Sequence, residues 1–460
     1  MTAKQPKIMN AQAPKKVLVV GLGKTGLSCA RYLSRAGHQV AVTDDRQDPP
    51  GFAALRDDLP DVALFLGRFE PDAFANAEQI VVSPGVSLKH PLIGEARARG
   101  VEIIGDIELF ARAAKAPVIA ITGSNGKSTV TTLVGEMARV AGVNAKVGGN
   151  LGTPALDLLP VDEVEPDLYV LELSSFQLES TFMLAARAAV ILNISPDHLD
   201  RYSGVDDYAK AKQRIYRNAE IQIINLDDSY AARLADAQRT HIGFGVQPPS
   251  AGNDGAGNYG VRDVEGRSWL MRGGERLLPV DEIRMPGRHN LSNALAALAL
   301  GDAAGLPREA MFETLRTFGG LPHRTQWVAE ANGVVWYNDS KGTNIGATLA
   351  AVQGMDRPVV LIAGGQGKGA DFRLLREGLE GRLRAVVLIG EDAPLIEAAL
   401  QGMTTLVRAD SMEAAVQAAA EQARPGDAVL LSPACASFDM FKGYDHRGDV
   451  FMDAVRRVVK

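Results

Sequence analysis

The chain is poor in cysteine, lacks long apolar runs and carries no excess of positive charge, and each absence excludes a class of protein. Its 460 residues include only two cysteines, Cys29 and Cys435, which lie far apart within apolar patterns. Two isolated thiols are typical of buried cysteines in a reducing compartment and do not form a disulfide framework. The sequence has no run of about 18 uninterrupted apolar residues and therefore predicts no membrane-spanning helix.

The charge balance argues against polyanionic partners. The formal net charge is −6 and the sequence pI is about 5.8, so nucleic acids and anionic membranes meet no global attraction. Hydrophobic residues make up 46% and charged residues 23%, which is typical of a soluble globular protein. The segment from Met1 to Lys16 is polar and has no apolar core. We therefore expect a short disordered leader on a cytoplasmic protein.

Short apolar runs alternate with helical patterns along most of the chain, which predicts parallel sheets covered by helices. One such series opens at Val17, a second at Val118 and a third near Leu321, and a Gly-rich, strand-like stretch follows Gly243. A single hydrophobic core stops growing near about 250–300 residues, so a chain of this length needs several domains. The sequence predicts three α/β domains, at residues 1–114, 115–320 and 321–460.

A phosphate-binding loop is predicted where the second series begins. The strand Val118–Ile121 runs into a glycine-rich turn and then into a helix. Backbone N–H groups of such a turn wrap phosphate oxygens, a lysine reaches the β- and γ-phosphates, and a hydroxyl ligates Mg²⁺. The residues concerned are Gly123, Ser124, Asn125, Gly126, Lys127, Ser128 and Thr129. Ile121 stands where the usual pattern has its first glycine, and an ordinary capped turn is the alternative.

Two further polar groups follow strands of the same domain. Glu172 comes directly after Leu168–Leu171, and His198 follows Ile191–Ile194. Ligands of open α/β sheets bind outside the carboxyl ends of the strands, so the loop, Glu172 and His198 should converge on one crevice. A carboxylate suits Mg²⁺, whereas a neutral histidine more often forms a plain hydrogen bond. We interpret the neighbouring Asp197 and Asp200 as caps or solvated loop acids.

The first domain has a glycine fingerprint of its own. The segment Gly21-Leu-Gly-Lys-Thr-Gly26 follows a strand, and Asp44 and Asp45 lie about 20 residues further on, as a dinucleotide-binding fold requires. This pattern alone suggests NAD, although the same geometry holds any ligand with a pyrophosphate or a ribose. A second glycine run, from Gly148 to Gly152, is either a turn or a substrate contact.

Together these residues resemble the Mur ligase family. The resemblance extends from Gly21 to about Phe451. Nine ordered motifs carry it, and they are Thr122-Gly-Ser-Asn-Gly-Lys-Ser-Thr129, Gly148-Gly-Asn-Leu-Gly152, Leu171-Glu-Leu-Ser-Ser-Phe-Gln-Leu-Glu179, Asn193-Ile-Ser-Pro-Asp-His-Leu-Asp-Arg-Tyr202, Lys212-Gln-Arg-Ile-Tyr216, His289-Asn-Leu-Ser-Asn293, Leu321-Pro-His-Arg-Thr325, Asn338-Asp-Ser-Lys-Gly-Thr-Asn344 and Ser432-Pro-Ala-Cys-Ala-Ser-Phe-Asp439. The probability that nine motifs agree in the same order by chance is very small.

The resemblance implies both a fold and an activity. It implies a Rossmann-like N-terminal domain, a central P-loop ATPase-like domain and a Rossmann-like C-terminal domain. It further implies an ATP-dependent ligase that joins D-glutamate to UDP-N-acetylmuramoyl-L-alanine through an acyl phosphate, in the synthesis of peptidoglycan precursors. The implied partners are these small molecules alone, and we expect a monomer.

The resemblance also implies roles for the residues of the ATP site. The catalytic residues would be Lys127, Glu172, His198 and Lys212. Two Mg²⁺ ions would be held, one by Ser128 and Glu172 and the other by His198 and a carbamoylated Lys212, with Lys210 as the competing lysine. Nucleotide contacts beyond the loop would be Asn290, Asn293, Arg324, Asp339 and Lys341. The two asparagines could instead be helix N-caps.

Two more binding sets follow from the resemblance. The UDP-sugar set is Gly23, Lys24, Thr25, Gly26, Asp44, Asp45, Arg46, Ser83, Asn150 and Ser174. The D-glutamate set is Thr343, Lys368, Ser437 and Tyr444, the last at a position where the family often has phenylalanine. The alternatives are an NAD-dependent oxidoreductase, a paralogous ligase that adds L-alanine to the sugar nucleotide or glutamate to folate, and a nucleotide-gated scaffold without catalysis.

Overall fold

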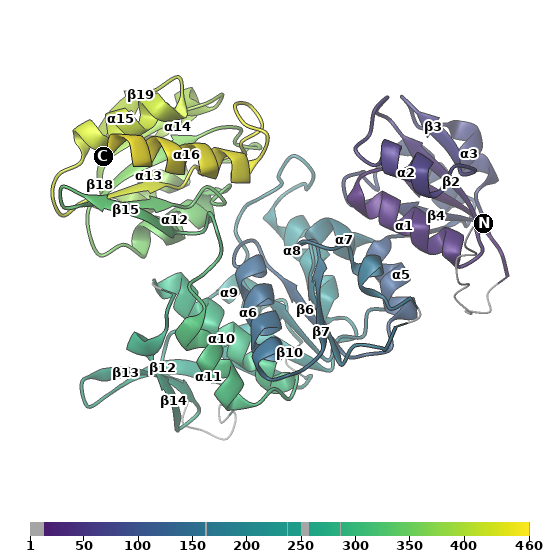
Figure 1. The fold of residues 1–460 in the computed structure, drawn as a ribbon, viewed down its shortest axis with the longest axis horizontal. Helices are drawn as coiled ribbons and strands as arrows, with labels where there is room; N and C mark the ends of the chain where they lie inside the picture. Colours follow the sequence, from purple (N-terminus) through teal and green to yellow (C-terminus); the bar gives the residue numbers. More distant parts are fainter. Residues whose placement is uncertain (1–12, 162, 237, 250–256, 286, 460) are drawn as a thin grey trace.

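Three α/β domains follow one another along the chain, and the central domain lies between the other two (Figure 1). The structure is a computed structural model, and it describes residues 13–161, 163–236, 238–249, 257–285 and 287–459. The predicted leader falls largely on residues 1–12, outside this part. Within the described residues, no helix is both long enough and apolar enough to span a membrane. Both cysteines are free and buried, as predicted.

The N-terminal domain has a five-stranded parallel sheet of order β3-β2-β1-β4-β5. Its elements in chain order are β1 (Lys16–Val20), α1 (Lys24–Arg35), β2 (Gln39–Asp44), α2 (Phe52–Asp58), β3 (Ala63–Leu66), α3 (Pro71–Asn76), β4 (Gln79–Val82), α4 (Pro91–Ala98), β5 (Glu102–Ile104) and α5 (Asp106–Ala113). Apart from Lys16, the β1 side chains are buried, because alternate residues of this strand belong to two different apolar clusters, Val17 and Val19 to one and Leu18 and Val20 to the other.

The central domain has a nine-stranded sheet of order β14-β13-β12-β11-β10-β9-β6-β8-β7, which is parallel from β7 to β12 and antiparallel beyond. Its strands are β6 (Val118–Thr122), β7 (Ala145–Gly149), β8 (Leu168–Glu172), β9 (Ala188–Ile191), β10 (Ile221–Asn225), β11 (His241–Phe244), β12 (Tyr259–Val264), β13 (Arg267–Arg272) and β14 (Glu275–Pro279). Its helices are α6 (Lys127–Val140), η1 (Ala155–Leu158), α7 (Ser175–Glu179), α8 (Val205–Gln213), η2 (Arg214–Tyr216), α9 (Ser229–Ala232), η4 (Val280–Glu282), α10 (Arg288–Ala303) and α11 (Arg308–Thr317).

The C-terminal domain has a six-stranded sheet of order β15-β16-β20-β17-β18-β19, in which only the β15–β16 pair is antiparallel. Its elements are β15 (Gln326–Ala331), β16 (Val334–Asn338), α12 (Ile345–Gln353), β17 (Val359–Gly364), α13 (Arg373–Leu379), β18 (Leu383–Ile389), α14 (Ala393–Leu400), β19 (Thr405–Arg408), α15 (Met412–Gln422), β20 (Ala428–Leu431) and α16 (Tyr444–Val458). The predicted three-domain α/β fold is therefore confirmed. The domain boundaries themselves stay predictions.

The register of the central sheet places the predicted catalytic groups at one edge. Strand β6 lies between β8 and β9, with Ile121 paired to Glu172 and Thr122 paired to Ile191. All three strands run in the same direction, so their carboxyl ends finish at one level. The loop after β6, the Glu172 carboxylate and the segment after β9 therefore face the same space.

The first two domains are joined by a common core and by buried polar contacts. One apolar cluster contains Leu33 and Leu55 from the first domain together with Leu171 and Ile191 from the second. The Glu108 carboxylate, fully buried, accepts hydrogen bonds from the backbone N–H groups of residues 182 and 183 at 2.7 and 2.9 Å. These contacts fix the first domain against the second, whereas the third domain packs on the central one mainly through polar loops.

One buried carboxyl at this junction is costly in its charged form. Asp106 is 2% exposed, and one of its oxygens accepts a hydrogen bond from Gln177 Nε2 at 2.9 Å. The other oxygen is buried without a partner among the described residues. Burial raises the pKa of Asp106 from 3.8 to about 6, although Gln177 and nearby backbone N–H groups oppose the shift.

We expect Asp106→Asn to stabilise the protein in a pH-dependent way. The pKa of Asp106 is higher in the folded than in the unfolded chain, so its carboxylate destabilises the fold as the pH rises from 3.8 to about 6. Removing that charge should raise the free energy of unfolding by about 1–3 kcal/mol at pH 8 and change little near pH 4. Urea unfolding at both pH values measures this, with the exposed Asp61→Asn as control. An equal effect at both pH values would contradict the prediction.

Candidate active site

The predicted phosphate loop connects β6 to α6, and its backbone requires glycine at two positions. Gly126 adopts a left-handed conformation with φ of 82° directly before α6. A Cβ atom on Gly126 would lie 2.5 Å from Asn293 Oδ1, and one on Gly123 would lie 3.0 Å from Leu192 Cβ. The loop therefore approaches the segments after β9 and at the start of α10 as closely as backbone alone allows.

Lys127 is folded back onto its own loop. Its Nζ donates to the carbonyl oxygens of Gly123 and Ser124, both at 2.9 Å. Burial lowers the pKa of Lys127, and Glu172 and Asp197 counteract this shift. The ammonium thus donates to two neutral acceptors. An anionic phosphate could take their place, because it would form a stronger, charge-assisted hydrogen bond with the ammonium.

Glu172 has one free carboxylate oxygen. The residue is 2% exposed, its Oε1 accepts from Asn150 Nδ2 at 2.6 Å, and its Oε2 has no hydrogen-bond partner among the described residues. A buried carboxylate oxygen without a donor is the kind of ligand that Mg²⁺ prefers. Within the described residues no group of three or more His, Cys, Asp or Glu side chains forms a metal site. A Mg²⁺ site here would therefore need the predicted hydroxyl and carbamate ligands as well.

His198 stands beside a buried ion pair. Its Nε2 lies 3.8 Å from Asp197 Oδ2, and its backbone has a positive φ of 55°. Asp197 Oδ1 accepts from Lys368 Nζ of the third domain at 2.6 Å. The interpretation of Asp197 as a cap or a solvated acid is therefore wrong. It failed because the lysine that pairs with Asp197 is distant in sequence and belongs to another domain.

The pKa values around His198 follow from this ion pair. Burial raises the pKa of Asp197, but Lys368 and His198 lower it more, so it lies below its usual value. Burial lowers the pKa of His198 despite the nearby Asp197 carboxylate. The imidazole is therefore neutral near pH 7, the form that can accept a proton or ligate a cation.

Of the two candidate lysines on α8, only Lys212 reaches the site. Lys212 is 1% exposed, whereas Lys210 is exposed to solvent. The Nζ atom of Lys212 donates to Thr122 Oγ1 at 3.2 Å and lies 4.7 Å from the centre of the Tyr208 ring. Burial lowers the pKa of Lys212 well below 10.5, and Lys127 lowers it further. A lowered pKa increases the unprotonated fraction of the amine near neutral pH, and only the unprotonated amine is nucleophilic.

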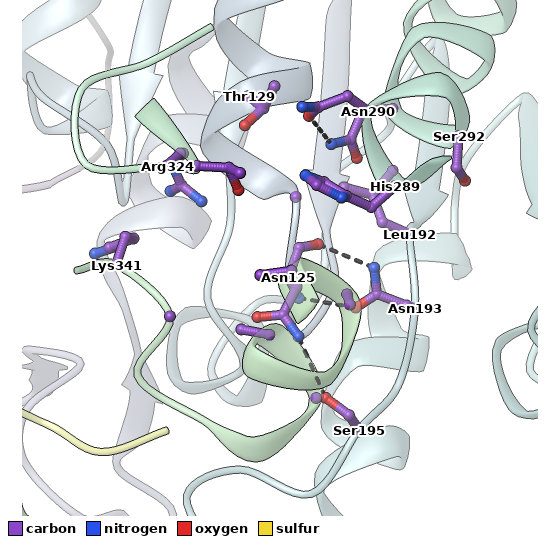
Figure 2. Close-up of a pocket in the computed structure, with 18 of the residues that line it drawn as sticks. Asn125, Thr129, Leu192, Asn193, Ser195, His289, Asn290, Ser292, Arg324 and Lys341 are labelled. Atoms are coloured by element: carbon purple, nitrogen blue, oxygen red, sulfur yellow. Dashed lines mark hydrogen bonds between the residues drawn. The ribbon is translucent and has the colours of Figure 1, made fainter. Parts of the chain in front are cut away.

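A cavity of about 300 Å³ lies between the phosphate loop, the start of α10 and the third domain (Figure 2). Asn290 and Asn293 line it from inside α10, whose N-cap is Gly287, so the N-cap alternative for both asparagines is wrong. His289 also lines it, and burial lowers its pKa to about 4. The walls of this cavity are mostly neutral amides and apolar groups, which suit a heterocyclic base.

The third domain supplies the cationic side of this cavity. Arg324 Nη2 donates to Ser128 Oγ at 2.7 Å, across the domain boundary and next to the predicted phosphate loop. Asp339 and Lys341 line the same cavity. The Asp339 carboxylate accepts from Thr325 N and Ser432 Oγ, and burial raises its pKa to about 6.

A second cavity, of about 800 Å³, lies between the first two domains. Eight of the ten residues predicted for the UDP-sugar line it, namely Gly23, Lys24, Thr25, Asp44, Asp45, Arg46, Ser83 and Asn150. The other two have structural contacts instead. A Cβ on Gly26 would lie 1.9 Å from Gly21 O, and Ser174 forms a capping box with Gln177 at the start of α7.

Sequence reasoning missed several residues of this cavity. Phe69, Lys89 and His90 line it, and the Phe69 and His90 rings pack edge to face at 4.9 Å. They lie on loops whose local patterns carry no motif. Asp44, which was predicted, lines the cavity, and its carboxylate accepts hydrogen bonds from the Leu22 N–H at 2.6 Å and from Arg46 at 2.7 Å.

The four residues predicted for D-glutamate lie in separate contacts. Lys368 is held by Asp197, and Tyr444 stacks on Lys341. Ser437 is buried, and its carbonyl accepts from Phe441 N at 2.8 Å. Thr343 N donates to the carbonyl of Lys341 at 2.8 Å. In this conformation Lys368 and Tyr444 are therefore engaged by Asp197 and Lys341.

Arg447 organises the third domain's side of the cleft and was missed. It is 1% exposed and donates to Ser340 O at 2.8 Å and to Cys435 O at 3.1 Å. It thereby ties the segment that carries Lys341 to the loop that carries Ser437. Its position gave a usable signal, since it lies four residues before Phe451 on the buried face of α16.

Helix α12 seats the third domain on the phosphate loop. Its N-cap, Asn344, exchanges hydrogen bonds with the side chain of Asn125 at 3.1 and 3.3 Å and donates to Asp197 at 3.2 Å. Gly346 then lies against Ser195, so that an added Cβ would be 2.7 Å from Ser195 Oγ and 2.9 Å from its Cβ. Figure 2 shows Asn125 near the middle of the residues that line the cavity and Ser195 below it, with a hydrogen bond from Asn125 Nδ2 to Ser195 Oγ between them.

The fold and the site define a phosphate-loop enzyme of three α/β domains, with an anion site shared between the second and third. The chain matches the Mur ligase MurD-like N-terminal domain over residues 15–105, the Mur ligase middle domain over 121–301 and the Mur ligase glutamate ligase domain over 323–435. The chain belongs to the Mur ligase family. The family resemblance found in the sequence is thereby confirmed, and membership argues against the NAD-dependent oxidoreductase.

Individual relatives agree with this assignment. A UDP-N-acetylmuramoylalanine–D-glutamate ligase from Nitrosococcus oceani is 54% identical over 453 residues, which cover 98% of each chain. One from Pseudomonas putida is 53% identical over 441 residues, covering 95% of this chain and 96% of the relative. The solved MurF ligase from Thermotoga maritima in complex with ADP shares the fold at a TM-score of 0.60 and 16% identity, covering 99% of this chain and 98% of that one.

The close approach of Gly346 to Ser195 gives a test of domain seating. Gly346→Ala should not disturb α12, because alanine is the better helix former. The added Cβ would clash with Ser195 only when the third domain packs on the central domain as it does in this structure. Overpacking of this kind costs about 1–3 kcal/mol, so we expect kcat/KM to fall about 5- to 150-fold.

The double variant Gly346→Ala with Ser195→Gly removes the clashing atoms and should recover most of the lost activity. Ser195→Gly alone is the control. Steady-state kinetics of the three variants measure the effect. Equal activity of Gly346→Ala and the unmodified protein would mean that the seated arrangement is not needed for turnover.

Proposed function

We propose that this protein uses ATP to join D-glutamate to UDP-N-acetylmuramoyl-L-alanine in peptidoglycan precursor synthesis. The observation that carries the proposal is the convergence of Lys127, Glu172 and Arg324 at the end of β6, which matches the charge needs of phosphoryl transfer to a carboxylate. The sequence identity of 53–54% with UDP-N-acetylmuramoylalanine–D-glutamate ligases, over nearly the full length of the chain, supports the choice of substrates.

The residues divide the reaction into two steps. The muramoyl-alanine carboxylate attacks the γ-phosphorus of ATP, while Lys127, Arg324 and the loop N–H groups stabilise the charge that spreads over the phosphoryl oxygens. ADP leaves, and an acyl phosphate is formed. The D-glutamate amine then attacks the acyl carbon, and phosphate leaves as the amide bond forms. Seating of α12 on the loop supports exclusion of water from the acyl phosphate.

The residues present fit a Mg²⁺ requirement. Ser128 and Glu172 would hold one ion, and His198 with a carbamate on Lys212 would hold a second. Bound Mg²⁺ neutralises charge on the phosphoryl oxygens. The free Glu172 Oε2 and the buried Lys212 amine support this assignment.

The remaining ligands are assigned by cavity. We propose that the cavity between the first two domains takes the UDP-sugar and that Thr343, Lys368 and Ser437 surround the D-glutamate site once Asp197 releases Lys368. We also propose that the protein acts as a monomer in the cytoplasm, where its two buried thiols stay reduced.

Substrate choice has a direct test. Mixing ATP, Mg²⁺ and UDP-N-acetylmuramoyl-L-alanine with single amino acids should release phosphate with D-glutamate at a rate at least about 100-fold above that with L-alanine, L-lysine or L-glutamate, since two carboxylates in one chiral arrangement must be matched. Phosphate release measures the rate, and Lys127→Met serves as the inactive control. Release with L-alanine or L-lysine but not D-glutamate would refute the assignment.

The role of Lys212 can be tested separately. Lys212→Ala removes the carbamate and should lower kcat by about 100-fold. Acetate or formate should restore part of the activity, because either anion supplies a carboxylate oxygen in the vacated space. The matched control is the exposed Lys210→Ala, which should change little. Full activity of Lys212→Ala without any added anion would exclude the carbamate.

A further inference from the structure

The ammonium group of Lys341 lies on the face of an aromatic ring. Its Nζ is 3.7 Å from the centre of the Tyr444 ring, well within the range of an attractive cation–π contact. Lys341 lines the nucleotide cavity, whereas Tyr444 is the first residue of α16. The contact thus joins a residue of the nucleotide cavity to one that the sequence assigned to the amino-acid site.

Lys341 depends on this ring more than an exposed lysine would. Within the described residues its ammonium forms no hydrogen bond and no ion pair, while the neighbouring charges include Arg324, Lys127, Glu172 and Asp445. Burial lowers the pKa of Lys341 to about 8, Arg324 and Lys127 add to this, and the two carboxylates oppose it. A desolvated ammonium among other cations gains more from a ring face than a solvated one.

The ring itself is held from two sides. Ser340 Oγ donates to the backbone carbonyl of Tyr444 at 2.7 Å, which fixes the start of α16 beside the Lys341 segment. The His323 ring packs against Tyr444 edge to face at 6.1 Å. Neither contact uses the phenol hydroxyl, so the face of the ring is what Lys341 requires.

We propose that Tyr444 is a positioning residue for nucleotide binding, which holds the Lys341 ammonium at the wall of the nucleotide cavity through its ring face. Tyr444 thus acts on ATP through Lys341 instead of contacting D-glutamate. The proposal rests on the proposed function in one respect, that the nucleotide occupies the cavity lined by Lys341.

Three replacements at position 444 separate the ring face from the hydroxyl and from bulk. Tyr444→Phe keeps the face and should keep the affinity for a non-hydrolysable ATP analogue with Mg²⁺ within about twofold. Tyr444→Leu fills similar space without a face, and we expect its affinity to fall about 3- to 30-fold. Fluorinated phenylalanines at this position should weaken binding in step with the number of fluorines, because fluorine removes negative charge from the ring face.

Calorimetry measures this binding without the other substrates, and a double-mutant cycle identifies the partner. In a Lys341→Met background, Tyr444→Leu should cause little further loss. Steady-state kinetics of Tyr444→Leu should show a raised KM for ATP and an unchanged KM for D-glutamate. A raised KM for D-glutamate with unchanged analogue binding would instead make Tyr444 an amino-acid contact and overturn the proposal.

The outcomes also separate this proposal from the function on which it rests. Binding of the analogue to the unmodified protein with equal affinity for Tyr444→Leu would overturn the positioning role alone. No binding to the unmodified protein would overturn both.

Discussion

The cleft gathers five cationic side chains before any ligand arrives, and their mutual repulsion is the constraint on which its structure depends. These are Lys127, Lys212, Arg324, Lys341 and Lys368, and burial or neighbouring cations lower the pKa of the first four. Like charges at short range in a poorly solvated site are strongly unfavourable. The fold tolerates this concentration of positive charge because each of the five side chains contacts a protein group with a negative or partly negative charge. Lys127 uses two backbone carbonyls, Arg324 the Ser128 hydroxyl, Lys368 the Asp197 carboxylate, and Lys212 and Lys341 aromatic rings.

The same contacts explain how the third domain is placed. Arg324 and Lys368 both reach from the third domain to partners on the central one, and Asn344 adds amide hydrogen bonds between them. Surface ion pairs contribute little, but the pair of Asp197 and Lys368 is largely buried and is supported by Asn344. The domains are therefore joined by the groups that would hold the substrates. Ligand binding and domain seating must consequently be coupled.

Much of the fold and site could be predicted from the sequence because both depend on buried parallel strands. Runs such as Val118–Ile121 are apolar throughout, and the loops after them carry the ligand groups. Strands β3, β7, β15 and β19 lie at sheet edges, where partial exposure breaks the apolar run and weakens the local pattern. Contacts between distant segments were also beyond reach. Asp197 pairs with Lys368 across 171 residues, and no local pattern indicates such a partner.

The partners of the five cations differ in how readily a ligand can replace them. Hydrogen bonds from an ammonium to neutral carbonyls are weaker than those to phosphate, so Lys127 can exchange its partners with a gain in energy. Asp197 is itself an anion, so its release of Lys368 requires another carboxylate in its place, and D-glutamate carries two. The ring under Lys341 need not leave, because a ring face and an oxygen ligand can occupy opposite sides of one nitrogen. The cleft thus combines exchangeable partners where ligands enter with permanent ones where a cation must stay fixed.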